Sequence, residues 1–214
     1  ILLSRLASHV IVKSNAMADV LGGKLKASGR LSVIPNGVDI DRFQPQDHTQ
    51  AREILGWNPN RNYILFPSDP NRANKGYELA SAAVKLVARE LDRPVDLIPL
   101  WGVAPEEVPV YMNACDVMTL ASFAEGSPNV VKEALACGLP TVSTAVGDVP
   151  EMLAGIRTCY ISTRDPADMA HGILRVIAME GRETSRKRIL ESGLTLDAVA
   201  GRIEAIYQKI VQRN

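Results

Sequence analysis

Short apolar runs alternate with amphipathic stretches along most of this chain of 214 residues. The short runs, bounded by turn residues, predict strands. The longer stretches, in which apolar side chains recur every three or four positions, predict helices. Strands that alternate with helices form βαβ units. The pattern therefore predicts an α/β fold in which a parallel sheet is flanked by helices and the crossovers are right-handed.

The predicted strands span residues 9–13, 31–34, 63–66, 95–100, 116–120, 141–144 and 158–161. The predicted helices span residues 15–26, 47–55, 76–90, 105–113, 128–136, 165–179, 182–190 and 196–211. Asn15 is placed to cap the first of these helices. The helix over 76–90 is expected to bury one apolar stripe, made of Leu79, Ala83, Leu86, Val87 and Leu91.

The two ends of the chain do not fit the central alternation. One strand and one helix precede the turn at Pro35-Asn36-Gly37, and they resemble the end of another folding unit. The last helix follows two others without a strand between them, so it is expected to pack away from the main sheet. Because the first residue is Ile, we also expect the chain to be part of a longer protein.

Composition and charge narrow the classes of function. Lys and Arg number 24, as do Asp and Glu, and this balance argues against a nucleic-acid binder. Three Phe, two Trp and five Tyr leave a mostly aliphatic core, which argues against a sugar-binding sandwich with aromatic platforms. The cysteines at 115, 137 and 159 lack CxxC spacing and are typical of reduced, buried thiols in a cytoplasmic protein. No apolar run approaches the roughly 20 residues of a membrane span, and no signal peptide is visible.

Ligands of an open α/β sheet bind beyond the carboxyl ends of its strands, so the loops over 68–75, 102–105, 122–129 and 146–149 are the candidate site. Several known signatures are absent from the sequence: GxGxxG, GxxxxGKS and GxSxG do not occur. His9, His48 and His171 show no HxH or HExxH spacing, so no metal site is expected.

The loop over 122–129 carries most of the chemical signal. Gly126 and Ser127 stand just before Pro128 at a helix start, where the backbone N–H groups of the first turn can bind a phosphate or diphosphate. Glu125 would repel that anion and is suited instead to the hydroxyls of a sugar. Glu133, eight positions later, could accept from a second pair of hydroxyls. The alternative interpretation is that both carboxylates are solvated surface groups.

The loop over 68–76 brings Arg72 and Lys75 to the end of another strand. Two cations that face a helix-start anion site could clamp a diphosphate between them. Taken alone, such a pair is more often solvated surface.

Five segments of the chain together resemble the carboxyl-terminal half of family 4 (GT-B) glycosyltransferases. They are VIPNGVD at 33–39 with Phe43, the loop that ends at Lys75-Gly76, EGSPNVVKE at 125–133, ALACGLPTVS at 134–143 and GDVPE at 147–151. The resemblance covers nearly the whole chain. It implies a Rossmann-like donor-binding domain, plus a remnant strand and helix of the acceptor-binding domain. We expect residues 1–35 to be that remnant, 36–195 the donor domain and 196–214 a closing helix.

The resemblance also implies roles for individual residues. Glu125 would hold the donor hexose, and Glu133 the ribose hydroxyls. Lys75 and Arg72 would hold the diphosphate together with backbone amides of the 126–130 segment, which is made of Gly126, Ser127, Pro128, Asn129 and Val130. The base would meet the loop of Trp101, Gly102 and Val103. The family often has Gly-Arg directly after its first strand, where this chain has Pro67-Ser68-Asp69, so Lys75 is the closer match.

The expected activity is transfer of a sugar from a nucleotide-sugar to a glycan, lipid or small-molecule acceptor with retention of anomeric configuration. No cofactor and no metal are expected. The family's acceptor-binding domain supplies a Gly-rich loop and a histidine that this chain lacks, since His9 lies in a strand. The expected partner is therefore the missing amino-terminal domain, and this chain alone is expected to be inactive. The compartment would be the cytoplasm, with the full enzyme at the inner face of the membrane. The alternatives are a catalytically silent sugar-nucleotide-binding module and a non-transferase GT-B enzyme such as an epimerase.

Overall fold

A five-stranded parallel sheet forms the centre of the computed structural model, which describes residues 6–21, 25, 27–179 and 184–212. Its strands are β3 (Asn62–Phe66), β4 (Val95–Pro99), β5 (Val117–Leu120), β6 (Thr141–Thr144) and β7 (Cys159–Ser162). They lie in the order β4-β3-β5-β6-β7, and each neighbouring pair is parallel. The order reverses between β3 and β5, because the chain first adds β4 on one side and then returns past β3.

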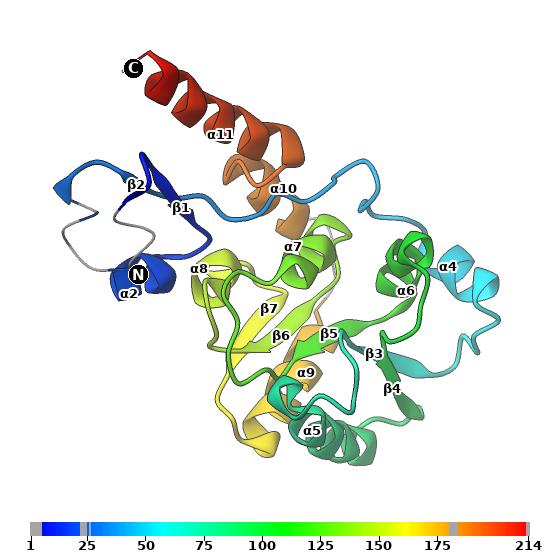
Figure 1. Cartoon of the computed structure of the whole chain (residues 1–214). Helices are drawn as coiled ribbons and strands as arrows, with labels where there is room; N and C mark the ends of the chain where they lie inside the picture. The colour runs from blue at the N-terminus through cyan, green and yellow to red at the C-terminus, as the bar shows by residue number, and fades with distance from the viewer. Residues whose placement is uncertain (1–5, 22–24, 26, 180–183, 213–214) are drawn as a thin grey trace.

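Helices cover both faces of this sheet (Figure 1). One face carries α5 (Tyr77–Glu90) and α9 (Pro166–Ile177), which pack against each other. The other face carries α6 (Val108–Ala114), α7 (Asn129–Ala136) and α8 (Val149–Leu153). Peripheral to these lie α4 (His48–Ile54) on α6 and α10 (Thr184–Glu191) on α7, with short 3₁₀ turns at Ala73–Lys75 and Pro105–Glu107.

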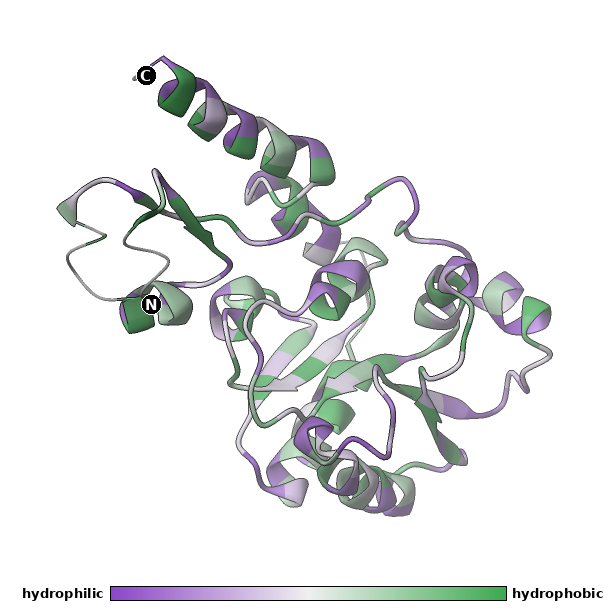
Figure 2. Ribbon diagram, viewed as in Figure 1, coloured by the Kyte–Doolittle hydropathy of each residue, from purple (hydrophilic) through white to green (hydrophobic). Residues whose placement is uncertain are grey.

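Two apolar clusters hold these layers together, one on each face of the sheet. Ile64 and Phe66 of β3 point to the α5–α9 side, and Leu65 points to the α6–α7 side. This alternation follows from the two-residue period of a strand. Figure 2 shows the resulting hydrophobic colour on the strands and on the inner sides of the helices. Both faces of the central strands are buried, so β3 is apolar from Tyr63 to Phe66, as parallel strands usually are, whereas β6 buries two threonines and a serine.

The amino-terminal segment forms a small unit of its own. Strands β1 (Val10–Val12) and β2 (Leu31–Val33) pair in parallel, and α2 (Asn15–Leu21) lies between them in sequence. Beside this unit runs α11 (Leu196–Val211), and a hollow between them is lined by His9, Ser32 and Ile206 among others (Figure 1). The segment after β2 crosses the start of α11, where Val38 bonds to the backbone of Leu194 and Leu196.

The structure confirms the predicted alternation and the parallel sheet, and it differs from the sequence-based expectations in three details. Ser14, not Asn15, caps α2, because its Oγ accepts from the amide of Met17 at 3.3 Å. The fully or nearly buried face of α5 is Ala80, Ala83, Val84 and Val87, while Leu79, Leu86 and Leu91 are only partly buried. The small helix α8 was not predicted. The two strands of the amino-terminal unit lie within the predicted strands at 9–13 and 31–34, and the structure adds that they pair in parallel.

Candidate functional site

The point where the strand order reverses, between β3 and β5, is the position where doubly wound sheets bind ligands. The loop that follows β3 runs through Lys75, and the loop that follows β5 runs through Glu125. The two loops are joined directly, since the amide of Phe123 donates to the carbonyl of Asn74 at 3.0 Å. The candidate site therefore stands on two adjacent strand ends.

Gly76 allows the two loops to approach each other this closely. Its φ is 72°, and a Cβ at this position would lie 2.2 Å from the carbonyl oxygen of Ala121. A residue with a side chain would therefore push the two loops apart and would also be strained at this φ. Gly76 thus fixes the position of Lys75, its neighbour.

Lys75 and Glu125 form a largely buried ion pair, with Nζ 2.6 Å from Oε1. Their side chains are 18% and 16% exposed. The sequence predicted separate duties for these residues, Lys75 for a diphosphate and Glu125 for a sugar. The structure brings them together, so each charge is neutralised by the other.

Helix α7 begins next to this pair with no side-chain cap. Its N-cap residue, Pro128, offers no acceptor to the first-turn amides. Asn129 at the helix start is exposed and accepts from Nδ2 of Asn36 at 3.0 Å, which ties the segment after β2 to the helix. Uncapped first-turn amides retain the capacity to bind an anion.

Gly147, in the loop after β6, supports the start of α7 from behind. A Cβ on Gly147 would lie 2.3 Å from the carbonyl oxygen of Gly126 and 2.8 Å from that of Glu125, so the two backbones are in direct contact. The position of the 125–127 backbone is therefore set partly by the 146–148 loop.

Lys132 is a fully buried lysine beneath this loop, which sequence reasoning missed. Its Nζ contacts Oγ of Ser127 at 2.7 Å, and burial lowers the pKa of its ammonium group, opposed by the charge of Asp148. Burial also raises the pKa of Asp148, opposed by a hydrogen bond from Ser127 and by the charge of Lys132. Ser127 thus sits between a buried cation and a carboxylate.

Glu133 lies one residue further along α7 and is partly buried. Burial raises the pKa of its carboxyl group, and the nearby positive charge of Arg42 opposes that rise. Arg42 in turn donates to the carbonyl of Pro105, in the loop that follows β4. Glu133 therefore faces the side of the site where the base was expected.

The remaining predicted residues lie around this centre. Arg72 is exposed and lines a separate hollow of about 430 Å³ with Tyr77, Phe123 and Arg164. Trp101 is 63% exposed in the loop after β4, next to Gly102. Arg72 and the loop of Trp101, Gly102 and Val103 remain predictions for ligand contacts.

Residues 74–179 match the protein family described as "Glycosyl transferases group 1". This span contains Lys75, Glu125 and Glu133, and Arg72 lies just before it. The chain belongs to the group 1 glycosyltransferases.

Curated relatives of this group 1 domain include two enzymes named D-inositol 3-phosphate glycosyltransferase. The protein from Mycobacterium sp. (strain KMS) is 27% identical, over 88% of this chain and 49% of its own length. The protein from Geodermatophilus obscurus is 28% identical, over 97% of this chain and 51% of its own length. The chain therefore spans about half the length of these relatives.

Solved structures support the GT-B donor-domain fold. Sucrose-phosphate synthase from Thermosynechococcus elongatus aligns with a TM-score of 0.78 and 21% identity, over 97% of this chain and 59% of its own. Anabaena HepE, solved in complex with UDP, aligns with a TM-score of 0.76 and 20% identity, over 97% of this chain and 65% of its own. The C-terminal domain of a glycosyl transferase group 1 family protein from Francisella tularensis aligns with a TM-score of 0.56 and 18% identity. The alignment covers 78% of this chain and 98% of that domain.

Sequence reasoning missed Lys132, Asp148 and Arg42 as parts of this group 1 site. Within α7, Lys132 follows two valines and precedes Glu133, so the sequence alone does not separate it from an ordinary helix lysine. Among the described residues, no cluster of His, Cys, Asp and Glu could hold a metal ion. Within the same residues, no helix is both long and apolar enough to cross a membrane.

Proposed function

We propose that this chain binds a nucleotide-sugar and forms the donor half of a retaining glycosyltransferase. The observation that carries the proposal is the largely buried Lys75–Glu125 pair at the strand-order reversal, beside the uncapped start of α7. A cation, a carboxylate and a row of free amides are the groups that a sugar diphosphate needs.

Each part of the donor has a proposed partner. The diphosphate takes Lys75 away from Glu125 and also accepts from the first-turn amides of α7. Released from Lys75, Glu125 accepts from hydroxyls of the donor hexose. Glu133 accepts from the ribose hydroxyls, and the base lies near Trp101 to Val103. Arg72 would reach the diphosphate only if its loop folds inward from the hollow that it lines.

The proposed mechanism is stabilisation of the leaving group. When the anomeric C–O bond breaks, its electron pair moves to the diphosphate, and the charge of Lys75 and the dipole of α7 stabilise it there. The acceptor hydroxyl bonds to the anomeric carbon on the face that the diphosphate leaves, and its proton passes to the departing phosphate oxygen. Glu125 orients the hexose, which raises the effective concentration of the reacting atoms. We assign no nucleophile to this chain.

The partners and the compartment belong to the same proposal. The UDP complex of Anabaena HepE favours a nucleoside diphosphate in the equivalent site. The acceptor, a glycan, a lipid-linked glycan or a small molecule, would be held mainly by a second domain, because the curated relatives are about twice as long as this chain. All three cysteines are buried, and burial raises the pKa of Cys159 to about 12, which suits the reducing cytoplasm.

Calorimetric titration with UDP, GDP and ADP, and with their hexose conjugates, tests the proposal. Lys75→Ala should weaken binding of the bare nucleotide by about 1–3 kcal/mol, because a charge-assisted contact is lost. Lys85→Ala is the matched control, since Lys85 is an exposed lysine on α5. Unchanged affinity in Lys75→Ala would remove Lys75 from the site.

The two carboxylates are separated by a second titration. Glu133→Ala should weaken binding of the bare nucleotide, whose ribose loses a partner. Glu125→Ala should leave the bare nucleotide bound and weaken the intact sugar donor. Equal loss of bare-nucleotide affinity in both variants would refute this division of roles, and failure of every nucleotide to bind would refute the donor site itself.

A further inference from the structure

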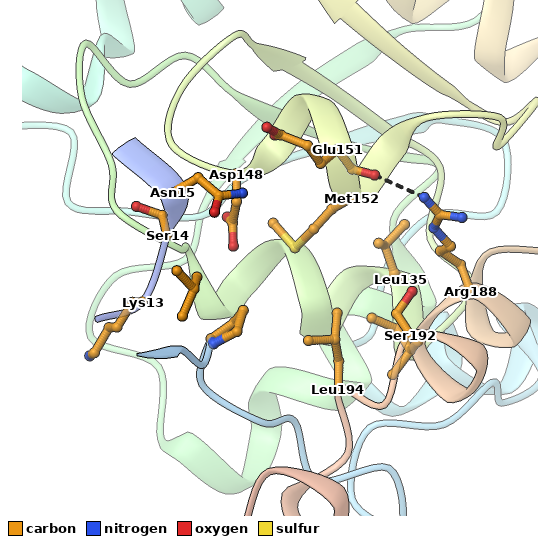
Figure 3. Close-up of a pocket in the computed structure, with 13 residues that line it drawn as sticks. Lys13, Ser14, Asn15, Leu135, Asp148, Glu151, Met152, Arg188, Ser192 and Leu194 are labelled. Carbon is orange, nitrogen blue, oxygen red and sulfur yellow. Dashed lines mark hydrogen bonds between the residues drawn. The ribbon is translucent and has the colours of Figure 1, made fainter. Parts of the chain in front are cut away.

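A second pocket, of about 250 Å³, lies directly behind the candidate donor site (Figure 3). It is bounded by the turn between β1 and α2, the segment after β2, and helices α7, α8 and α10. Asp148, the residue before α8, lies beside Ser14 and Asn15, and Met152 of α8 lies on the side of Leu135 and Leu194 (Figure 3). No residue proposed to contact the donor directly lines this pocket, and Asp148, which supports the donor loop through Ser127, is shared between the two.

The pocket lies where the carboxyl ends of two parallel sheets face each other. Lys13 to Asn15 follow β1, and Pro35 follows β2, while Asp148 follows β6 of the main sheet. Ligands of parallel sheets bind beyond the carboxyl ends of the strands. The topology of both sheets therefore favours a ligand site in this pocket.

Asp148 leaves one carboxylate oxygen available to a ligand. Its Oδ1 is buried and accepts no hydrogen bond from any residue that the structure describes. A buried carboxylate oxygen without a donor is costly, and native proteins usually satisfy such an atom. A ligand hydroxyl in the pocket would supply the donor.

The rest of the lining selects a neutral ligand with one polar edge and one apolar face. The Oγ of Ser14 already accepts from Met17, so its O–H remains to donate, and the Asn15 amide can both donate and accept. The opposite wall is apolar and includes Leu135, Met152 and Leu194. The charged side chains around the pocket balance, with Lys13 and Arg188 against Asp148 and Glu151.

The pocket touches the donor loop through its own walls. Asp148 interacts with Ser127, and α2, which begins at the lining residue Asn15, carries Met17, whose sulfur would lie 3.5 Å from a Cβ on Gly126. A ring held in the pocket is therefore next to the segment that carries Glu125, the proposed partner of the donor hexose.

We infer that this pocket binds one sugar-sized, neutral polyol ring of the acceptor, through a hydroxyl on Asp148 Oδ1 and an apolar ring face on Met152. The inference rests on the proposed function for its link to the acceptor. Its volume is below the roughly 300–1,000 Å³ typical of drug-sized ligands, which suits a single ring.

Saturation-transfer NMR with the methyl glycosides of glucose, galactose and mannose tests the inference, with inorganic phosphate as the anionic comparison. At least one glycoside should bind, and its ring C–H protons should receive the strongest saturation. Ser192→Trp should close the pocket mouth from an exposed position without altering the core, and Met152→Trp should fill the pocket itself. Both variants should weaken glycoside binding at least about tenfold. Leu190→Trp adds the same ring on the exposed side of α10 and should bind like the parent.

UDP titration of every variant keeps the two hypotheses distinguishable and reports that each variant is folded. Glycoside binding that Ser192→Trp leaves unchanged overturns the inference, as does a parent protein that binds UDP and no glycoside. Binding of phosphate in the pocket in place of a glycoside also overturns it. A parent protein that binds a glycoside but does not bind UDP would refute the proposed donor site and leave the pocket as a polyol site.

Discussion

Glu133 combines a cost to the fold with a proposed use in binding. Its raised pKa, caused by burial, means that the folded protein holds the charged carboxylate less favourably than the unfolded chain does. The resulting destabilisation is absent at pH values below the unfolded-state value of 4.5, appears as pH rises past it, and is complete above the raised folded-state value. At neutral pH Glu133, the proposed partner of the ribose hydroxyls, therefore lowers the stability of the protein.

Glu133→Gln should separate these two effects. The variant should melt at a higher temperature than the parent at neutral pH, by about 2–4 °C for each kcal/mol gained, and the gain should vanish in acid. It should also bind the nucleoside diphosphate more weakly than the parent at neutral pH. Calorimetry across pH measures both quantities. Glu90→Gln, at an exposed position of α5, should change neither, and a neutral-pH melting temperature of Glu133→Gln at or below the parent value would contradict the argument.

At the scale of elements, α7 is fixed to the loop after β6 by buried charge. Lys132 contacts Ser127, and Asp148 contacts the same hydroxyl, so all three set the backbone that the diphosphate is proposed to bind. We expect Lys132→Met and Asp148→Asn each to weaken UDP binding. The double variant should bind UDP no more weakly than the single variant with the lower affinity, because both changes disturb one network.

A double-mutant cycle in UDP titrations measures this coupling. Residues that share one network typically show interaction energies of about 0.5–3 kcal/mol. Simple addition of the two single effects would mean that Lys132 and Asp148 act separately. Lys85→Met is the control for loss of a lysine.

Two arginine–carboxylate pairs, one from Arg52 of α4 and one from Arg61 before β3, provide a matched comparison. Arg52 donates to Asp116 at 2.7 Å with only 7% of its side chain exposed, and it also donates to the carbonyl of Ala114. Burial acts to raise the pKa of Asp116, but bonds from His48 and the Tyr63 amide and the charge of Arg52 outweigh it, so the pKa is lowered. The pair Arg61–Asp96 is more exposed, at 36% and 33%.

Arg52→Met should lower the free energy of unfolding by about 3–5 kcal/mol, because it leaves a buried carboxylate without its partner. Arg61→Met should cost about 0–1 kcal/mol, as is usual for exposed pairs. Urea denaturation at neutral pH measures both. Because the pKa of Asp116 is lowered, its stabilising contribution is present above the unfolded-state value of 3.8 and is lost as pH falls below it, so the deficit of Arg52→Met should shrink in acid. Equal losses of unfolding free energy in the two variants would contradict the conclusion that the Arg52–Asp116 pair matters more because it is more buried.

At the scale of the whole molecule, the central sheet and the two terminal segments differ in how well they are buried. Strands β3, β5 and β6 are almost entirely buried, whereas β1 and β2 form a sheet of only two strands. In α11 the one fully buried side chain of the described residues is Val199, and Leu196, Tyr207 and Val211 are exposed. Marginal burial permits local opening.

Hydrogen exchange should therefore be fast in β1, α2, β2 and α11 and slow from Tyr63 to Ser143. The apolar side chains exposed on α11 also favour self-association, so exchange should be compared at two protein concentrations. Uniform slow exchange in a strictly monomeric sample would mean that the terminal segments are integrated into the main core.

The alternation of the chain was enough to predict the main sheet and nearly every helix around it. Loop chemistry was enough to select Lys75, Glu125 and the start of α7. What the sequence could not provide were distances between loops that only folding brings together. The Lys75–Glu125 pair depends on Gly76 approaching Ala121, and Lys132 looks like an ordinary helix lysine until α7 is packed on the sheet. The short helix α8 is one turn long, too short to show a period.

The Lys75–Glu125 pair also determines what kinds of compound can recognise the empty protein. In a fragment screen, each compound would encounter Lys75 and Glu125 already paired with each other. An uncharged fragment leaves the attraction between the two charges in place and must compete with it for hydrogen bonds, and an anion alone must leave Glu125 without a partner. The compounds best able to enter combine an acidic group for the lysine with hydroxyl or ammonium donors for the glutamate, spaced to reach both at once. Inhibitor discovery against this site should therefore begin from bifunctional molecules and not from the smallest fragments.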